Sequence, residues 1–204
     1  MTVSFMKQPV NSTLFIDEVL LKEMTVVKIL GVYIQQNLKW DTHVSEMLKK
    51  CNRRIYMLCT LKRFNLPTLD LITVYVGYIR PILEYCVPVF NSSLTRKQIN
   101  DIEKVQKRVC KIILGPSYTS YKEALYTCNI LSLEERRKKL CFDFALKLEK
   151  SPRFSSWLPD QRQIKISLRN VPKYVQLCCK TDRLKRSAIP YFIQLLNDHY
   201  TCMI

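Results

Sequence analysis

Apolar residues recur at helical spacing through the middle of this chain. From Asp41 to about Arg63 they follow one another at intervals of four and three residues, which is typical of an amphipathic helix with one buried face. The apolar positions of this stretch are Val44, Leu48, Cys51, Ile55 and Leu58. The sequence therefore predicts a long helix over residues 41–63.

The next segment, residues 68–79, is apolar on nearly every side. Pro67 precedes it and suits the start of a helix, where proline's missing N–H leaves no hydrogen bond unmade. A helix that is apolar all round is typical of an element buried among others. Pro81 and Pro88 then predict a break or a kink in the chain after residue 79.

Three helix starts carry a capping signature, in which Ser or Thr is followed three residues later by Glu or Gln. They are Thr95 with Gln98, Ser120 with Glu123, and Ser132 with Glu135. The first of these helices has Ile or Val at positions 99, 102, 105, 109, 112 and 113 and ends at Gly115 and Pro116. The sequence predicts helices over residues 95–114, 120–126 and 133–150.

Strand-forming residues are concentrated near the N-terminus. Residues 13–34 contain two segments rich in Val, Ile, Leu and Phe, separated by Lys22 and Glu23. This pattern predicts one β-hairpin rather than a helix.

The C-terminal part is less regular. Residues 151–170 are rich in Pro, Ser, Arg and Gln and predict a loose connection, with apolar residues alternating as in a weak strand at 164–168. A last helix is expected from Pro190 to Asn197. The predicted fold is mainly α, a helical bundle preceded by a short β-hairpin, with a loosely packed C-terminal segment. The expected division of the chain is into residues 1–36, 37–150 and 151–204.

The charge of the chain points to a polyanionic partner. Lys and Arg number 33 against 17 Asp and Glu, so the formal net charge is +16. Nucleic acid and an acidic membrane surface would both satisfy this charge. No apolar run approaches the ~20 residues that a membrane-spanning helix needs, so we expect RNA, DNA or an RNA–DNA hybrid and no membrane.

The basic residues fall into three clusters. They are Lys49, Lys50, Arg53 and Arg54; Lys104, Lys107, Arg108 and Lys111; and Lys180, Arg183, Lys185 and Arg186. A single cluster of this kind is as readily explained by a solvated helix face as by a binding site. Three of them on a strongly basic chain favour contacts to phosphates.

The residues needed for catalysis are scarce. His43 and His199 are the two histidines, so a pair of His ligands at helical spacing is impossible. Two-metal nucleotidyl transfer needs clustered carboxylates, and the nearest approach is Asp17 with Glu18, which is better explained as an exposed charged pair. Three glycines are too few for a glycine-rich phosphate loop. We expect no enzyme activity, no metal, no cofactor and no small-molecule substrate.

The nine cysteines have no CxxC spacing, and several fall on apolar faces of predicted helices. A free thiol there behaves as a small apolar side chain, which favours reduced cysteines over disulfides or metal ligands. The N-terminus has no basic segment leading into an apolar one, as a secretion signal would. An intracellular location, nuclear or cytoplasmic, is expected.

The run from Lys28 to Val44 reads KILGVYIQQNLKWDTHV. It resembles the Lys-x-Leu-Gly-Val-x-Ile and Leu-x-Trp-x-x-His signature that follows the palm in reverse transcriptases of non-LTR, LINE-type retrotransposons. The matching residues are Lys28, Leu30, Gly31, Val32, Ile34, Leu38, Trp40, His43 and Val44. The resemblance continues at Tyr75, Ile79, Pro81, Leu83, Tyr85 and Cys86, at Gln106, Lys107 and Arg108, and between Thr181 and Asn197.

This resemblance implies a palm-derived hairpin followed by a thumb-like helical domain that holds a template and primer duplex. The catalytic Asp-Asp hairpin of that family is absent from this chain. The resemblance thus implies a non-catalytic fragment of an RNA-directed DNA polymerase from a transposable element, able at most to bind duplexes without sequence preference.

Residues from about Lys28 to Asp70 are also similar to an N-terminal segment of an AlkB-type tRNA-modifying protein with dioxygenase and methyltransferase parts. The chain has neither an iron-binding triad nor a glycine-rich S-adenosylmethionine loop to support those activities. Two alternatives remain open beside nucleic-acid binding: a helical protein-interaction module, with a protein partner covering the N-terminal hairpin, or a translated remnant without functional constraint.

Overall fold

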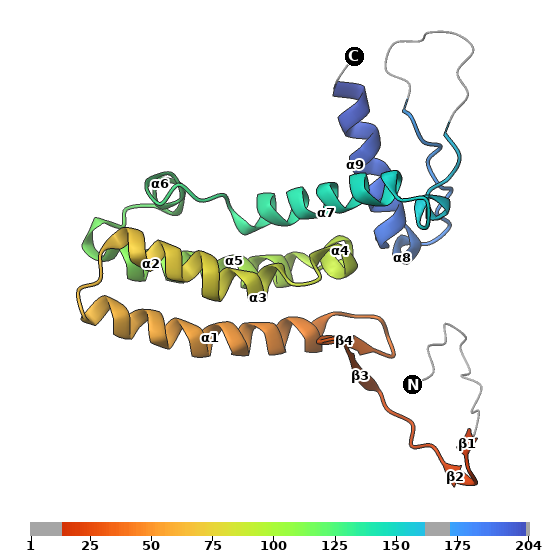
Figure 1. The fold of residues 1–204 in the computed structure, drawn as a ribbon, viewed down its shortest axis with the longest axis horizontal. Coiled ribbons are helices and arrows are strands. Elements are labelled where there is room, and N and C mark those ends of the chain that lie inside the picture. Colours follow the sequence, from red (N-terminus) through yellow and green to blue (C-terminus); the bar gives the residue numbers. More distant parts are fainter. Residues whose placement is uncertain (1–13, 162–171, 203–204) are drawn as a thin grey trace.

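A computed structural model describes residues 14–161 and 172–202 of the chain, and this part is mainly α-helical, as predicted. The main helices lie side by side in layers (Figure 1). α1 (Asp41–Arg63) forms one outer layer, α2 (Thr68–Val74), α3 (Arg80–Glu84) and α5 (Arg96–Leu114) form the middle, and α7 (Leu133–Lys150) covers the other side. Short 3-10 turns lie at Asn91–Ser93, Gly115–Ser117 and Ser155–Trp157.

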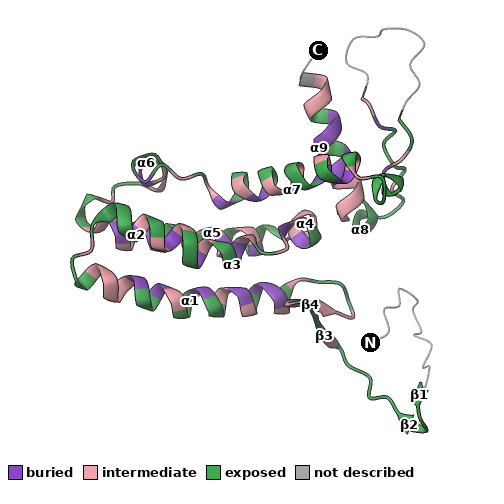
Figure 2. Ribbon diagram, in the orientation of Figure 1, coloured by how far each residue is buried: buried purple, intermediate pink, exposed green. Residues whose placement is uncertain are grey.

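One apolar core runs between these layers. Ile55, Leu71, Ile79, Ile102 and Ile113, from α1, the middle helices and the turn between them, are each at most 1% exposed. Figure 2 shows buried residues alternating with exposed ones along α1 and α7, as an amphipathic pattern requires. The helix predicted over residues 41–63 is confirmed, with its apolar stripe facing this core.

Pro81 distorts the predicted second helix without ending it. α2 passes into a π-helical turn at Tyr75–Ile79 and then into α3, which carries Pro81 in its first turn. Proline has no N–H to donate to the carbonyl of Gly77 one turn earlier, and a wider turn accommodates this loss. The chain then turns at Cys86, which has a left-handed φ of 55°, and enters α4 (Val87–Phe90).

The predicted capping signatures mark real helix starts. At α5, Thr95 Oγ1 accepts a hydrogen bond from the N–H of Gln98 at 3.2 Å, and Gln98 Oε1 accepts one from the N–H of Thr95 at 2.8 Å. The same reciprocal pair of bonds opens α7. The side chain of Ser120 caps α6 (Tyr121–Thr127). The helices predicted at these starts are confirmed.

The N-terminal strands form two short hairpins instead of the single one predicted. β1 (Phe15–Ile16) pairs with β2 (Val19–Leu20), and β3 (Val26–Ile29) pairs with β4 (Val32–Gln35), both antiparallel. Figure 1 shows the first pair projecting away from the helices, while the second lies at the start of α1.

The turns explain this difference. Asp17 and Glu18 have φ of 47° and 63°, and Leu30 and Gly31 have φ of 46° and 85°. A two-residue turn with both φ positive matches the twist of paired strands and closes a hairpin locally. The prediction of a turn at residues 22–23 was wrong, because Asp17 and Glu18 lack the glycine that usually marks such a turn.

The C-terminal helix is longer than predicted. α9 (Ala188–Cys202) begins two residues before Pro190 and continues past Asn197. A short helix that was not predicted, α8 (Asp182–Lys185), precedes it and is capped by the side chain of Thr181.

α9 packs across α7 and α4, and its buried residues include Phe192, Ile193 and Leu196. The weak strand predicted at residues 164–168 lies outside the described residues. The division of the chain into three parts stays a prediction.

A carboxylate near the end of α7 holds the segment before α8. Glu149 accepts hydrogen bonds from Lys173 Nζ at 2.7 Å, the Tyr174 hydroxyl at 2.6 Å and the Tyr200 hydroxyl at 2.9 Å. Burial by itself would raise the pKa of Glu149, but these donors outweigh burial and hold the pKa below its ordinary value of 4.5. The charged form of Glu149 therefore stabilises the C-terminal packing.

Replacing Glu149 with Gln should lower the free energy of unfolding by about 2 kcal/mol near neutral pH, because a charged acceptor of hydrogen bonds is lost. The contribution of the carboxylate is present above about pH 4.5 and is lost as the pH falls through the lowered pKa. Urea unfolding across pH should thus show the variant converging on the wild type in acid. Glu134→Gln, at the exposed start of the same helix, is the control and should change stability by less than about 0.5 kcal/mol. Equal stability of Glu149→Gln and wild type at neutral pH would contradict this account.

Candidate nucleic-acid interface

α1 and α5 lie side by side and run in the same direction. At their N-terminal ends, Gln98 Nε2 donates to Asp41 Oδ1 at 2.8 Å. At their C-terminal ends, Lys62 Nζ donates to the carbonyl of Ile113 at 2.8 Å. The two pairs are separated by 57 and 51 residues in sequence, so the helices run parallel, with an offset that changes by six residues from one end to the other.

This parallel arrangement brings part of the first predicted basic cluster level with the second. An intermediate offset of about 54 residues places Lys49 and Arg53 level with about residues 103 and 107 of α5. Lys104, Lys107 and Arg108 are exposed there, as are Lys49 and Arg53. We call the exposed cations of this helix pair the α1–α5 stripe: Lys49, Arg53, Lys104, Lys107, Arg108 and Lys111.

The ion pairs within the α1–α5 stripe leave its charge accessible. Lys49 lies 2.7 Å from Glu46 and Lys104 lies 2.8 Å from Asp101, but the two lysine side chains are 61% and 71% exposed. Exposed pairs of this kind contribute little and exchange readily with solvent or another anion. Arg53 and Arg108 make no salt bridge within the described residues.

Aromatic rings from the segment after α5 support the other two cations of the stripe. Lys107 Nζ lies 5.1 Å from the ring centroid of Tyr121, and Lys111 Nζ lies 5.4 Å from that of Tyr118. Contacts of a cation with an aromatic face restrict the side chain without neutralising its charge.

The first predicted cluster is divided between two surfaces. The Arg54 guanidinium stacks over the Tyr78 ring at 4.0 Å from its centroid and donates to the Tyr78 carbonyl. Lys50 and Arg54 both line a cavity on the α3 side of α1. Lys49 and Arg53 alone of this cluster belong to the α1–α5 stripe.

The third predicted cluster lies apart from the first two. Arg183 Nη2 donates to the carbonyl of Asn37 at 3.3 Å, which places α8 beside the loop before α1. The 8 residues from Asp41 to Lys49, the nearest member of the α1–α5 stripe on α1, span about 12 Å of helix. Arg183 and Arg186 therefore lie at the N-terminal end of α1, about two helical turns before the α1–α5 stripe begins on that helix, and Lys185 lies between them in sequence on α8. Lys180 precedes α8.

The better-buried acidic residues are used elsewhere in the fold. Glu84 accepts two hydrogen bonds from Arg136, at 2.8 and 2.9 Å, and these tie α3 to α7. Glu149 holds the C-terminal segment. These two carboxylates are thus engaged in packing and do not neutralise the α1–α5 stripe, whose ion pairs are those of Glu46 and Asp101.

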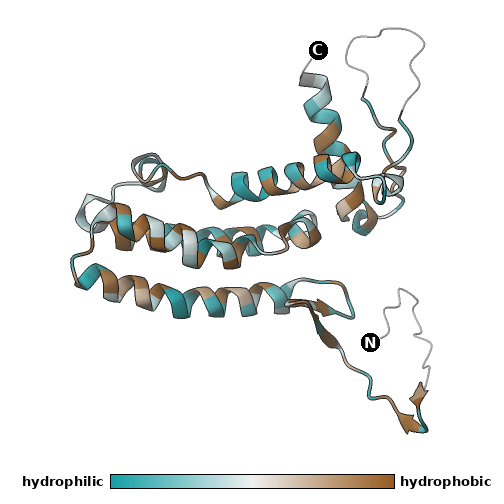
Figure 3. Cartoon of the chain, viewed as in Figure 1, coloured by the Kyte–Doolittle hydropathy of each residue, from teal (hydrophilic) through white to brown (hydrophobic). Residues whose placement is uncertain are grey.

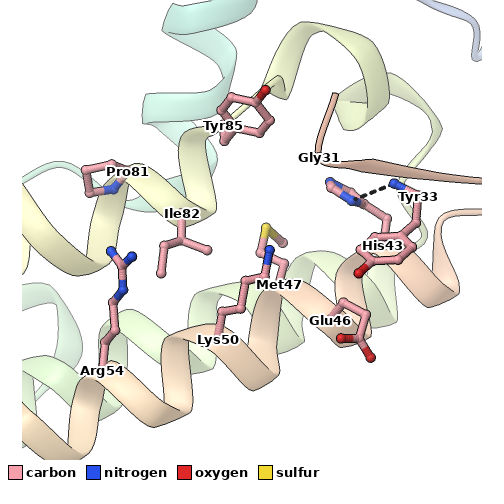
Figure 4. A pocket seen from close by; sticks show the side chains of 10 residues that line it. All are labelled: Gly31, Tyr33, His43, Glu46, Met47, Lys50, Arg54, Pro81, Ile82 and Tyr85. Atoms are coloured by element: carbon pink, nitrogen blue, oxygen red, sulfur yellow. Dashed lines mark hydrogen bonds between the residues drawn. The ribbon is translucent and has the colours of Figure 1, made fainter. Parts of the chain in front are cut away.

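A cavity of about 310 Å³ opens where the β3–β4 hairpin meets α1 and α3 (Figure 4). Its walls include two tyrosines, Tyr33 and Tyr85, the apolar side chains of Met47, Ile82 and Pro81, and the charged side chains of Glu46, Lys50 and Arg54. Sequence reasoning missed this site, because Tyr33 and Tyr85 come from distant segments and no spacing links them.

The hairpin tip closes one side of this cavity against α3. The Tyr85 hydroxyl donates to the carbonyl of Leu30 at 2.7 Å. A Cβ at Gly31 would lie 3.4 Å from the Tyr85 ring, and Gly31 also has φ of +85°. A larger residue at position 31 would therefore be strained by the positive φ, and its Cβ would contact the Tyr85 ring.

His43 forms a buried edge of the same cavity. It is 5% exposed and packs between the rings of Trp40 and Phe90, at centroid distances of 5.9 and 4.9 Å. Burial, together with the charge of Lys50, lowers the pKa of His43, so the imidazole is neutral. Its Nδ1 accepts a hydrogen bond from the N–H of Tyr33 at 3.5 Å, which places the ring proton on Nε2. Nε2 has no hydrogen-bond partner within the described part of the chain.

The other residues weighed in the sequence as catalytic groups or metal ligands lie in separate parts of the fold. Asp17 and Glu18 form the exposed turn between β1 and β2. His199 packs against Phe142 at a ring distance of 4.8 Å. Cys51 and Cys141 lie buried on apolar helix faces, and burial raises the pKa of each thiol to about 12.

Comparison with known protein families gives a partial match. A family model described as the N-terminal region of alkylated DNA repair protein alkB homolog 8 matches residues 40–80. These 41 of the 204 residues cover α1, α2 and the π-helical turn. No curated protein and no solved structure matches the chain. Within the described residues, no helix is both long and apolar enough to cross a membrane.

This match contradicts the resemblance to LINE-type reverse transcriptases. The matched family is an AlkB homologue, so the assignment as a polymerase fragment with a palm remnant and a thumb from a transposable element was wrong. The residues behind it have local roles, since Gly31 makes a turn and Trp40 and His43 pack on Phe90. The same residues are therefore explained by a β-hairpin that leads into a helix. The AlkB-type similarity noted from about Lys28 to Asp70 agrees better with the matched range.

Arg53 and Arg54 are neighbours with different surroundings, and they allow a matched test of this geometry. Arg54→Ala should lower the free energy of unfolding by about 1 kcal/mol, because it removes the contacts with Tyr78. Arg53→Ala removes the same charge from an exposed site and should change stability by less than about 0.5 kcal/mol. Urea unfolding of both variants measures this, and equal effects would show that Arg54 is as free as Arg53.

Proposed function

We propose that this chain is a non-catalytic module that binds nucleic acid, RNA, DNA or a hybrid of the two, through the α1–α5 stripe. The observation that supports this most is that Lys49 and Arg53, from the first basic cluster, lie level with the second cluster on parallel helices, although the two are distant in sequence. Phosphates along a strand or duplex form a regular row of negative charge, and a row of exposed cations can contact several of them at once. Contacts of this kind position the partner without reading its sequence.

Two further observations support the proposal. The net charge of +16 favours a polyanionic partner over a neutral one. The family matched over residues 40–80 is named for a protein of alkylated DNA repair, which agrees with a nucleic-acid ligand. The absence of catalysis is part of the proposal, because both histidines and the Asp17–Glu18 pair have structural surroundings.

Replacing Lys49, Arg53, Lys104 and Arg108 together with Gln should weaken binding to all nucleic acids tested. Each phosphate contact releases about one counterion when the complex forms. Losing a contact therefore makes the slope of log affinity against log salt shallower by about one unit. Fluorescence anisotropy with a labelled oligonucleotide at several salt concentrations measures both quantities.

The matched control replaces four exposed lysines of α7 with Gln: Lys138, Lys139, Lys147 and Lys150. This variant loses the same net charge on the opposite side of the bundle, so its affinity should fall much less. Equal losses in the two variants would mean that the chain binds through general charge and not through the α1–α5 stripe.

Protein binding through the N-terminal hairpins is a second candidate function. Phe15, Ile16, Val19 and Leu20 on the projecting β1–β2 hairpin are each at least 56% exposed. Figure 3 shows this hairpin as an apolar tip separated from the helices. An exposed apolar patch on short strands with free edges is typical of a site that pairs with another polypeptide.

Replacing Phe15 and Val19 with Lys should abolish self-association, since a second copy of the chain is the partner present in a purified sample. Sedimentation velocity over a range of protein concentrations should show association for the wild type and a monomer for the variant. Affinity for nucleic acid should be retained, because the α1–α5 stripe is distant from this hairpin. A wild-type chain that stays monomeric at all concentrations would argue against this second function.

A further inference from the structure

We propose that the cavity between the β3–β4 hairpin, α1 and α3 receives one unstacked base of a single-stranded nucleic acid, with the adjoining phosphate at Lys50 and Arg54. This inference rests on the proposed nucleic-acid binding and adds a preference for single strands.

The size and walls of the cavity suit a flat aromatic group. Pockets for small ligands begin at about 300 Å³, and this one has a volume of about 310 Å³. Tyr33 and Tyr85 line it with aromatic rings, and Met47 and Ile82 provide apolar contact. Every base has a π face that stacks on such rings. A duplex could not enter, because its bases are already paired and stacked.

The aromatic walls are held in place before any ligand arrives. The hydroxyl of Tyr85 is fixed by the Leu30 carbonyl, and its ring lies against Gly31. Tyr33 belongs to β4, whose register with β3 is set by the hairpin, and Lys28 lies 5.5 Å from its ring centroid. Tyr85 is nevertheless 51% exposed. A rigid, accessible tyrosine can stack on a base with little loss of side-chain entropy.

Charge at the rim fits the phosphate of the same nucleotide. Lys50 and Arg54 are four residues apart on α1 and so lie on one side of that helix. Glu46, the acidic residue of the lining, is bound to Lys49. Lys50 makes no salt bridge within the described residues. The rim thus keeps a positive charge beside an apolar and aromatic interior.

His43 closes the buried edge of the cavity. Its Nε2 is fully buried and has no hydrogen-bond partner within the described residues. His43 therefore contributes a wall of the cavity and not a hydrogen bond to the base.

The test uses the full chain and a short single-stranded oligonucleotide that carries one 2-aminopurine, whose fluorescence reports stacking. Tyr85→Ala should reduce single-strand affinity about tenfold and leave duplex affinity unchanged. Tyr85→Phe keeps the ring and should bind single strands nearly as well as the wild type. In the wild-type complex the fluorescence of 2-aminopurine should change, and it should change less with Tyr85→Ala.

The outcomes separate this inference from the proposed function. Duplex and single strand bound equally well, with no change of 2-aminopurine fluorescence in the wild-type complex, would overturn the base-binding cavity while nucleic-acid binding stands. A wild-type chain that binds neither at low salt would overturn both. If Tyr85→Ala does not fold, two other measurements test the cavity. The 2-aminopurine fluorescence should still change in the wild-type complex, and Lys50→Gln should weaken single-strand binding more than duplex binding.

Discussion

The parallel pairing of α1 and α5 is the constraint on which the other features depend. It is fixed at one end by Asp41 and Gln98 and at the other by Lys62, which binds a carbonyl at the end of α5. Two neighbouring helices that run in the same direction require a connection that returns across their length. α2 and α3 make that return, and the π-helical turn before Pro81 keeps their apolar residues in the core. The same return brings Tyr85 to the β3–β4 hairpin.

Much of this fold could be predicted from residue patterns. The spacing from Val44 to Leu58 predicted α1, and the capping pairs at Thr95 and Ser132 predicted α5 and α7 at their observed starts. These signals are local, because amphipathic spacing and N-terminal hydrogen bonds lie within one helix. The hairpins were harder, since the turn at Asp17 and Glu18 uses positive φ without glycine.

The candidate site was predicted only in part, because it depends on contacts between distant segments. Basic clusters near Lys49 and Lys104 were recognised, but their common level follows from the direction of α5 relative to α1. The separate role of Arg54 follows from Tyr78, which stands on another helix. The cavity could not be predicted from the sequence, because its lining residues also come from distant segments. The reverse-transcriptase resemblance failed because short runs such as the one from Lys28 to Val44 describe a hairpin and a helix start.

The charged residues fall into two groups, acids that stabilise the fold and exposed cations that are available to a ligand. Glu84 and Glu149 are committed to internal bonds, whereas the α1–α5 stripe keeps its charge in solvent. The most direct measurement is a titration of ¹⁵N-labelled protein with a single-stranded oligonucleotide, followed by amide chemical shifts. The account predicts shifts along the exposed faces of α1 and α5 and around Tyr33 and Tyr85, with α7 unaffected. Shifts concentrated on α7 or α9, or none at low salt, would contradict it.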